Sequence, residues 1–237
     1  MPIKEQSFTI KELDSLVMTI ELTLVSIMQG VALAVLAESS APVVTGMEVA
    51  YFPYVATGLI IILLFWARAL LHTFTVIRWP LEFGHNFLYV AGTLLEAILF
   101  TQVASPPLWF ALTAAYSLMV WLLFAVDLRM ISRRFAEYDL PAVRSLLDTV
   151  RREQLFNIRF VMPATVFLNA LCAVLIWRFP DLFIARHAHI VLGCMQLVVA
   201  VSYLSYSIAF YKRLRSLIVA AQHEWNGEVM TATQRRK

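Results

Sequence analysis

A stripe of polar and titratable side chains runs through one of the apolar parts of the sequence. Its members recur at helical spacing and therefore share one face of a helix: Glu82, His85, Asn86, Tyr89, Thr93 and Glu96. Carboxyl and imidazole groups can take up and release protons, and inside a bilayer they usually face a bundle interior or a wet cavity. The stripe therefore predicts either a path for protons or ions, or a hydrogen-bonded seam between helices.

The seam interpretation needs partners on neighbouring helices, and the sequence offers three. Arg68 and His72 belong to the preceding apolar stretch, and Glu21 belongs to the first. Arg68 lies too deep in its stretch to reach the membrane surface, so we expect it to have a carboxylate or carbonyl partner. The depth of Arg68 in the membrane favours Glu21 over Glu96 as this partner.

Two histidines and one carboxylate raise the alternative of a haem or metal redox protein. His72 and His85 lie nearly level on either side of a tight turn, and Glu82 precedes His85 at the spacing of a carboxylate metal site. A di-iron site needs a second such motif, which the sequence lacks, so we expect no metal and no other cofactor. Cys172 and Cys194 lack the spacing of a zinc site and are expected to pack between helices, with a disulfide left open.

In the first apolar stretch, small and hydroxylated residues form one face of the predicted helix. They recur at helical spacing and end in a Gly-x-x-x-Ala motif, with a glutamine beside them: Thr19, Thr23, Ser26, Gln29, Gly30 and Ala34. This pattern lets two helix backbones approach closely, and it also suits the wall of a narrow pore. We expect close packing, with the pore lining as the alternative.

The elements that position these residues follow from the composition. Of the 237 residues, 60% are hydrophobic and 15% are charged, against about 25% charged in an average soluble domain. This excludes a soluble enzyme, a disordered chain and a nucleic-acid-binding domain, because soluble monomers rarely expose so much apolar surface. Stretches of about 20 apolar residues cross a bilayer as helices. We predict an all-α, single six-helix transmembrane domain, with spans at 15–37, 52–77, 81–103, 107–131, 156–177 and 188–211.

The breaks between the spans and the basic residues predict the topology. Prolines and short polar residues mark the breaks, the first of them at 38–42. Of the 19 Lys and Arg residues, only Arg178 and Arg186 fall outside when the N-terminus is placed in the cytoplasm. We therefore expect a multi-pass protein of the bacterial inner membrane, with both termini cytoplasmic and the lipid bilayer as a partner. The cytoplasmic tail at 218–237 turns polar and is expected to fray.

One sizeable soluble segment is predicted, a cytoplasmic amphipathic linker at 132–157. A helix that starts at Pro141, with Asp139 as its N-cap, would carry a basic face opposite an apolar one. It would either lie on the inner leaflet or serve as a plain linker, and it would offer a docking site for a cytoplasmic protein partner. Asp127 and Arg159, near the inner ends of adjacent spans, are expected to form an ion pair.

The residues that carry a family resemblance lie in the first three spans: Leu13-Asp14-Ser15, Thr23-Leu24, Phe65-Trp66, His72 and Asn86. With the six-helix layout, they resemble the bacterial relatives of the lysosomal potassium and proton leak channel family. The Phe-Ser-Asp motif that opens the first helix of that family is absent here. The resemblance implies that the first helix of each subunit lines a central pore of an oligomer, with apolar side chains forming the constriction.

These patterns predict an integral membrane channel that conducts small cations or protons as a homo-oligomer. The sequence holds no serine-hydrolase, phosphate-binding or dinucleotide-binding motif, so we expect no enzyme. A non-conducting scaffold that docks a partner and a haem or metal redox protein stay open as alternatives. The candidate path or network comprises Thr19, Glu21, Thr23, Ser26, Gln29, Arg68, His72, Glu82, His85, Asn86, Tyr89 and Glu96.

Overall fold

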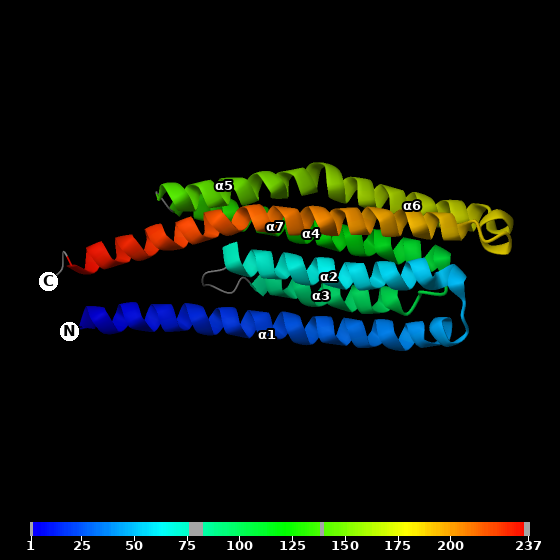
Figure 1. Ribbon diagram of the computed structural model, residues 1–237, viewed down its shortest axis with the longest axis horizontal. Helices are drawn as coiled ribbons and strands as arrows, with labels where there is room; N and C mark the ends of the chain where they lie inside the picture. Colours follow the sequence, from blue (N-terminus) through cyan, green and yellow to red (C-terminus); the bar gives the residue numbers. More distant parts are fainter. Residues whose placement is uncertain (1, 76–82, 138–139, 235–237) are drawn as a thin grey trace.

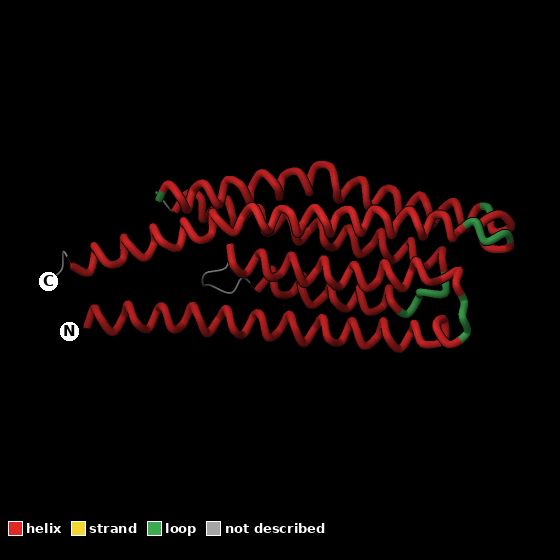
Figure 2. The backbone as a smooth tube through the Cα atoms, viewed as in Figure 1, coloured by secondary structure: helices red, strands yellow, loops and turns green. Residues whose placement is uncertain are grey.

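The computed structural model of the protein describes residues 2–75, 83–137 and 140–234, and all regular secondary structure in these ranges is helical. The α-helices are α1 (Pro2–Thr45), α2 (Phe52–Thr75), α3 (Phe83–Phe100), α4 (Pro106–Glu137), α5 (Pro141–Phe156), α6 (Met162–Arg178) and α7 (His189–Gln234). A short 3₁₀ turn and two π-helical turns complete the set: η1 (Val49–Tyr51), η2 (Asn157–Val161) and η3 (Asp181–Ala185). The described loops lie at the two ends of a long bundle (Figure 2).

Within the described ranges, five helical segments are long and apolar enough to cross a membrane: Leu22–Thr45, Val49–Leu71, Pro106–Arg133, Pro141–Arg178 and His189–Ala221. These segments indicate a multi-pass membrane protein. Beside them runs α3, of which 18 residues are described. The chain reverses direction between successive helices, except that α6 continues the course of α5, so both chain ends lie at one end of the bundle (Figure 1). We name this the terminal end and the opposite one the distal end.

The first helix runs further than the break at 38–42 predicts. That prediction is wrong, because α1 continues to Thr45 with Pro42 inside it. A proline in the last turn removes one backbone hydrogen bond without ending the helix before it. The reversal comes at Met47, whose φ of 50° is left-handed, and the Glu48 N–H donates to the Val43 carbonyl at 2.9 Å.

The long helices form a ring around an aromatic interior. In this ring α1 packs against α2 and α3, α3 against α4, α4 against α6, and α7 against α2. In contrast, the backbones of α6 and α7 lie further apart, so side chains close the ring between these two helices. Inside the ring Tyr54, Trp109 and Phe110 are almost completely buried, and Tyr54 meets the other two rings edge to face. Aromatic packing between α2 and α4 therefore holds the interior.

The helix predicted from Pro141 is present as α5, and protein covers its apolar face. Leu146 and Val150 are buried in a cluster with Leu71, Ile131 and Leu214. The face that the sequence assigns to the inner leaflet is therefore packed on α4, α7 and the end of α2. Because η2 joins α5 to α6, this helix extends the bundle at its terminal end.

The first turn of α5 receives a carboxylate from α7. The Ala142 N–H donates to the Glu224 carboxylate at 2.7 Å, a favourable contact at the positive end of a helix dipole. Asp139, the predicted cap, lies outside the described residues. The helix that supplies Glu224 extends to Gln234, so the chain continues as helix beyond 218.

Candidate functional site

The polar stripe of α3 faces the interior of the ring. His85, Tyr89, Thr93 and Glu96 are all buried, and Glu96 has no exposed surface. Asn86 is half-buried beside them. The side chains of Glu21, His72 and Glu82 lie outside the described residues.

Glu96 finds its partner on α1. The Gln29 amide Nε2 donates to Glu96 Oε2 at 3.1 Å, whereas Gln29 Oε1 and Glu96 Oε1 have no hydrogen-bond partner among the described residues. Gln29 therefore points into the ring. Thr23 and Ser26 lie on the exposed side of α1, and their hydroxyl groups donate to carbonyls of their own helix. Gln29, which the sequence places beside these small residues, therefore lies on a different side of α1 from them.

Arg68 pairs with the end of α5. Its Nη1 donates to Glu153 Oε1 at 2.7 Å and its Nη2 donates to Gln154 Oε1 at 2.8 Å. The guanidinium also lies 4.7 Å from the centroid of the Phe124 ring. Among the described residues the carboxylate that pairs with Arg68 is therefore Glu153, and the expected partner Glu21 has its side chain outside them. The partner comes from the segment that the sequence assigns to a linker, because α5 folds back against the bundle.

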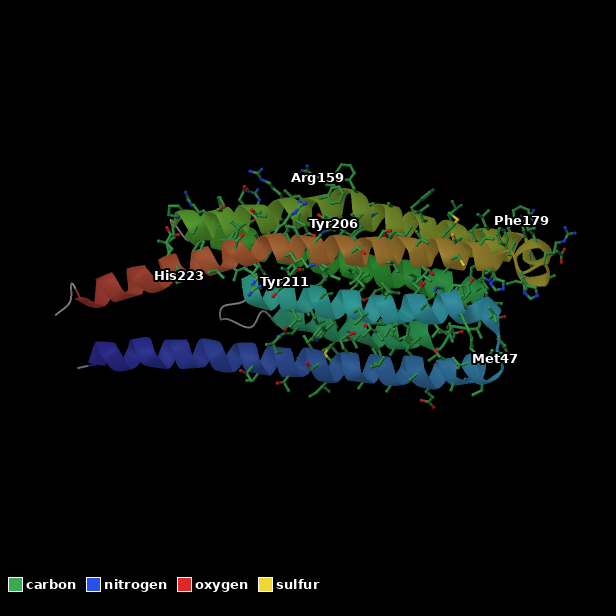
Figure 3. All side chains as sticks on the ribbon, viewed as in Figure 1. Met47, Arg159, Phe179, Tyr206, Tyr211 and His223 are labelled. Carbon is green, nitrogen blue, oxygen red and sulfur yellow. The ribbon has the colours of Figure 1, made fainter. Side chains whose placement is uncertain are left out.

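The same network extends to α3 and α4. Gln154 Nε2 donates to Asp127 Oδ2 at 3.3 Å, and Asp127 Oδ1 lies 3.1 Å from His85 Nε2. Asp127 therefore pairs with His85 rather than with Arg159, and the predicted Asp127–Arg159 pair is wrong. Arg159 belongs to η2, and its side chain is exposed on the outer side of the bundle (Figure 3).

On the other side of Glu153 the network reaches α7. Asn157 Nδ2 donates to Glu153 Oε1, and the Tyr203 hydroxyl donates to Asn157 Oδ1 at 3.0 Å. Asn157 is fully buried and begins the π-helical turn η2, a type of turn that is frequent at functional sites. We call this set the terminal polar network: Arg68, His85, Asp127, Glu153, Gln154, Asn157 and Tyr203.

A second polar chain crosses the ring nearer its distal end. The Trp109 indole donates to Gln196 Oε1 at 2.7 Å, and Gln196 Nε2 donates to Asn169 Oδ1 at 2.7 Å. At the distal end itself the Tyr54 hydroxyl donates to the His189 carbonyl at 2.9 Å. These contacts join α4, α7, α6 and α2. Glutamine and asparagine inside apolar spans were the sequence signal for them, but a single sequence does not tell which helices meet.

A cavity of about 360 Å³ lies between the two polar groups. Arg68 and Tyr203 of the terminal polar network lie in its wall, as do Gln196 and Asn169 of the distal chain. The rest of the wall consists mainly of apolar and aromatic side chains from α2, α4, α6 and α7, with Tyr89 from α3.

A shallow groove lies between α5 and α7 toward the terminal end. Its wall includes Asp148, Arg152 and Glu153 of α5 and the ring of Tyr206 of α7, which Figure 3 labels. Glu153 thus belongs to the wall of the groove, while its partner Arg68 belongs to the wall of the cavity. The Arg68–Glu153 ion pair therefore stands between two hollows.

The described residues contain no group of three or more His, Cys, Asp or Glu side chains that could hold a metal ion. His85 of the proposed haem or metal pair is engaged with Asp127. Cys172 is half-buried and Cys194 is exposed, and both thiols are free. Comparisons with protein-family models, with curated proteins and with solved structures find no match to this chain.

Proposed function

We propose that the chain is a multi-pass membrane protein that conducts protons or small cations, and that protons cross inside the helix ring of one subunit. The observation that carries the proposal is the position of the Arg68–Glu153 ion pair. It stands between a cavity inside the ring and a groove toward the terminal end. Buried charges in membrane helices often mark ion pathways and proton relays, so this pair is the proposed gate.

Protons suit this arrangement better than metal cations do. The terminal polar network links the carboxylates of Glu153 and Asp127 to the imidazole of His85 and the hydroxyl of Tyr203. Relays of Asp, Glu and His move protons in membrane pumps and transporters. The cavity wall is mostly apolar, whereas a filter for metal ions replaces their hydration shell with rings of oxygen atoms.

The proposal includes a homo-oligomer in the bacterial inner membrane with both termini in the cytoplasm. An exposed face of α1 supports the oligomer. Gly30 would have no atom within 4 Å of an added Cβ, and Thr23 and Ser26 lie exposed near it. A second copy of the chain could approach closely along this face. In this arrangement each subunit has its own proton path.

A membrane scaffold is the second candidate, supported by the basic side of α5. Arg144, Arg151 and Arg152 are exposed on this helix at the terminal end. An acidic cytoplasmic protein could bind this surface without any conduction. Purification of a stoichiometric partner together with absent flux would favour the scaffold.

The test is proton flux into liposomes that contain the purified chain and a pH-sensitive dye. A potassium gradient with valinomycin supplies the driving potential. We expect proton uptake that the variant Glu153→Gln lowers about tenfold, because the amide keeps its contact with Arg68 but cannot carry a proton. The rate of dye response is the measurement.

Arg159→Gln serves as the control, because it removes a charge near the same network from an exposed side chain. Its flux should equal that of the unaltered chain. Equal flux in Glu153→Gln and the unaltered chain would contradict the proposed path. Absence of flux for protons, potassium and sodium would contradict conduction altogether.

A further inference from the structure

We infer that the ring cavity is a binding site for a neutral, lipid-like molecule with an apolar chain and one uncharged hydrogen-bonding end. The inference does not rest on proton conduction, because binding can be measured without flux, and a molecule that fills the cavity would displace the water that the proposed proton path needs there. It rests on the opening of the cavity, on the chemistry of its wall and on two hydroxyl groups in that wall.

The cavity opens sideways between α6 and α7. Leu168 of α6 and Met195 and Val199 of α7 line the cavity and are also exposed on the outside, by 50%, 61% and 55%. Side chains that belong to both surfaces mark the mouth. It lies on the outer side of two membrane-spanning segments, where the backbones of α6 and α7 are held apart and the Gln196–Asn169 hydrogen bond bridges them. A ligand can therefore enter from the bilayer rather than from water.

The side chains of the cavity wall favour the apolar hydrocarbon chain of a ligand. Most lining side chains are aliphatic or aromatic, including Ile61, Phe65 and Leu123. The volume of about 360 Å³ lies within the range of pockets that hold small organic ligands. Such a cavity is unfavourable for a hydrated ion but favourable for a hydrocarbon chain.

Two hydroxyl groups provide the place for a polar end. Tyr116 and Ser117 of α4 line the cavity and are 93% and 95% buried, with exposures of 7% and 5%. Within the described part of the chain neither hydroxyl has a hydrogen bond, and neither oxygen is among the fully enclosed polar atoms without a partner, so both remain accessible from the cavity. The hydroxyls of Thr57, Thr113 and Thr165, which also line the cavity, all donate to the backbone carbonyl four residues earlier in the chain. Buried hydroxyls without partners are costly, so a ligand oxygen near Tyr116 and Ser117 would stabilise both.

The positive charge of Arg68 in the cavity wall does not favour a ligand with a carboxylate end. Arg68 is the cationic lining residue, and its guanidinium already donates to Glu153 and Gln154. A carboxylate ligand would compete with Glu153 for this group. An alcohol, amide or ester end therefore fits the site better than a carboxylate.

The experiment uses the full chain in phospholipid nanodiscs and a dodecanol that carries a photoreactive diazirine. After illumination, peptide mass spectrometry locates the label. We expect labelled residues on the cavity faces of α4, α6 and α7, and at least fivefold less labelling there when excess dodecanol is added. Dodecanoate should compete less well than dodecanol.

A pair of α7 variants tests whether the label reports the cavity. Ala200→Phe adds a ring in the cavity wall, whereas Val198→Phe adds the same ring at an exposed position outside that wall. We expect cavity labelling to fall about tenfold in Ala200→Phe and to stay unchanged in Val198→Phe. Equal labelling in both variants would overturn the site.

A further variant keeps the shape of the cavity and removes its polar groups. In Tyr116→Phe/Ser117→Ala, dodecanol should compete about tenfold less well, because two hydrogen bonds are lost, whereas dodecane should compete equally in both proteins. If dodecanol competed equally well in both proteins, the ligand would not use the two hydroxyls, and this part of the inference would be overturned. Water would then be the partner of the hydroxyls.

A phospholipid with a diazirine in its acyl chain tests whether the apolar chain in the cavity comes from bulk lipid or from a free amphiphile. Cavity labelling by this lipid but not by the alcohol would identify bulk lipid as the occupant and overturn a free ligand. Cavity labelling by the alcohol that the added phospholipid cannot displace would support a free amphiphile. Uniform labelling of lipid-facing residues such as Val198, without cavity preference, would overturn both.

Discussion

At the terminal end, Arg68 holds three elements together. Its guanidinium donates to Glu153 and Gln154 of α5 and lies over the ring of Phe124 of α4, while its own backbone belongs to α2. A charge in this position is stable only with partners, because transfer of an unpaired ion from water into a low-dielectric interior is costly. The Arg68 side chain is 15% exposed and that of Glu153 is 3% exposed, so removal of either leaves a poorly hydrated charge.

Arg68→Met is therefore expected to lower the free energy of unfolding by about 3–5 kcal/mol, the usual cost of breaking a buried ion pair from one side. The double variant Arg68→Met/Glu153→Leu should recover part of this loss, because no lone carboxylate remains. Thermal unfolding in detergent, followed by circular dichroism, is the measurement.

Arg159→Met provides the comparison, since Arg159 is exposed. Its unfolding midpoint should match that of the unaltered chain. An Arg68→Met midpoint as high as that of Arg159→Met would contradict the role of Arg68 as the centre of the network.

The sequence identified three of the seven residues of the terminal polar network. Helical spacing indicated His85. Arg68 was recognised as a charge deep within a span, and Asp127 was recognised as a charge near the end of a span. Glu153, Gln154 and Asn157 were not found, because they lie at the junction of a presumed linker and a span. Their inward direction depends on how α5 packs against α4 and α7, which is a long-range property that spacing along one helix does not contain.

At the scale of elements, α7 and α2 approach closely where α7 has a glycine. A Cβ on Gly193 would lie 3.1 Å from Tyr54 Cζ and 3.3 Å from Pro53 Cβ. Tyr54 has little freedom to move, since its ring is fully buried and its hydroxyl donates to the His189 carbonyl. Gly193 therefore sets the distance between the two helices.

Two glycine substitutions should have opposite effects on stability. Gly193→Ala is expected to cost about 1–3 kcal/mol because the methyl group is overpacked against α2. Gly30→Ala meets no atom within 4 Å in the single chain, so the helix propensity of alanine should stabilise α1 by up to about 1 kcal/mol. Unfolding midpoints of the two variants, measured side by side in detergent, check this, and a stabilised Gly193→Ala would contradict the close approach.

At the scale of the whole molecule, helical content and membrane character could be predicted from composition and from apolar length. The order of helices around the ring could not. The backbones of the consecutive helices α6 and α7 approach each other little, whereas α2 packs closely against α7 and α4 packs closely against α6. Apolar faces in a membrane carry little information about partners, because lipid and protein are similarly apolar. Polar pairs such as Gln196–Asn169 specify neighbours, and these are recognised only when both helices are placed.

The position of both chain ends at the terminal end predicts an even number of crossings. A short epitope tag at either terminus should therefore be digested by protease on the same side of sealed membrane vesicles (Figure 1). The measurement is immunoblotting of each tag in right-side-out and inverted vesicles. Tags protected on opposite sides would mean an odd number of crossings, as would occur if α3 did not cross the membrane.

The π-helical turn η2 accommodates one residue more than a regular α-helix without changing the directions in which α5 and α6 face. A residue of a π-helix turns the chain by less than the roughly 100° of an α-helical residue, so the five residues from Asn157 to Val161 cover about the same angle as four α-helical residues would. Deletion of one residue from this turn would therefore leave a regular helix with Glu153 and Gln154 still directed at Arg68. A single-codon deletion within α6, in contrast, would rotate α5 by about 100° and move every inward-facing group of α5 at once.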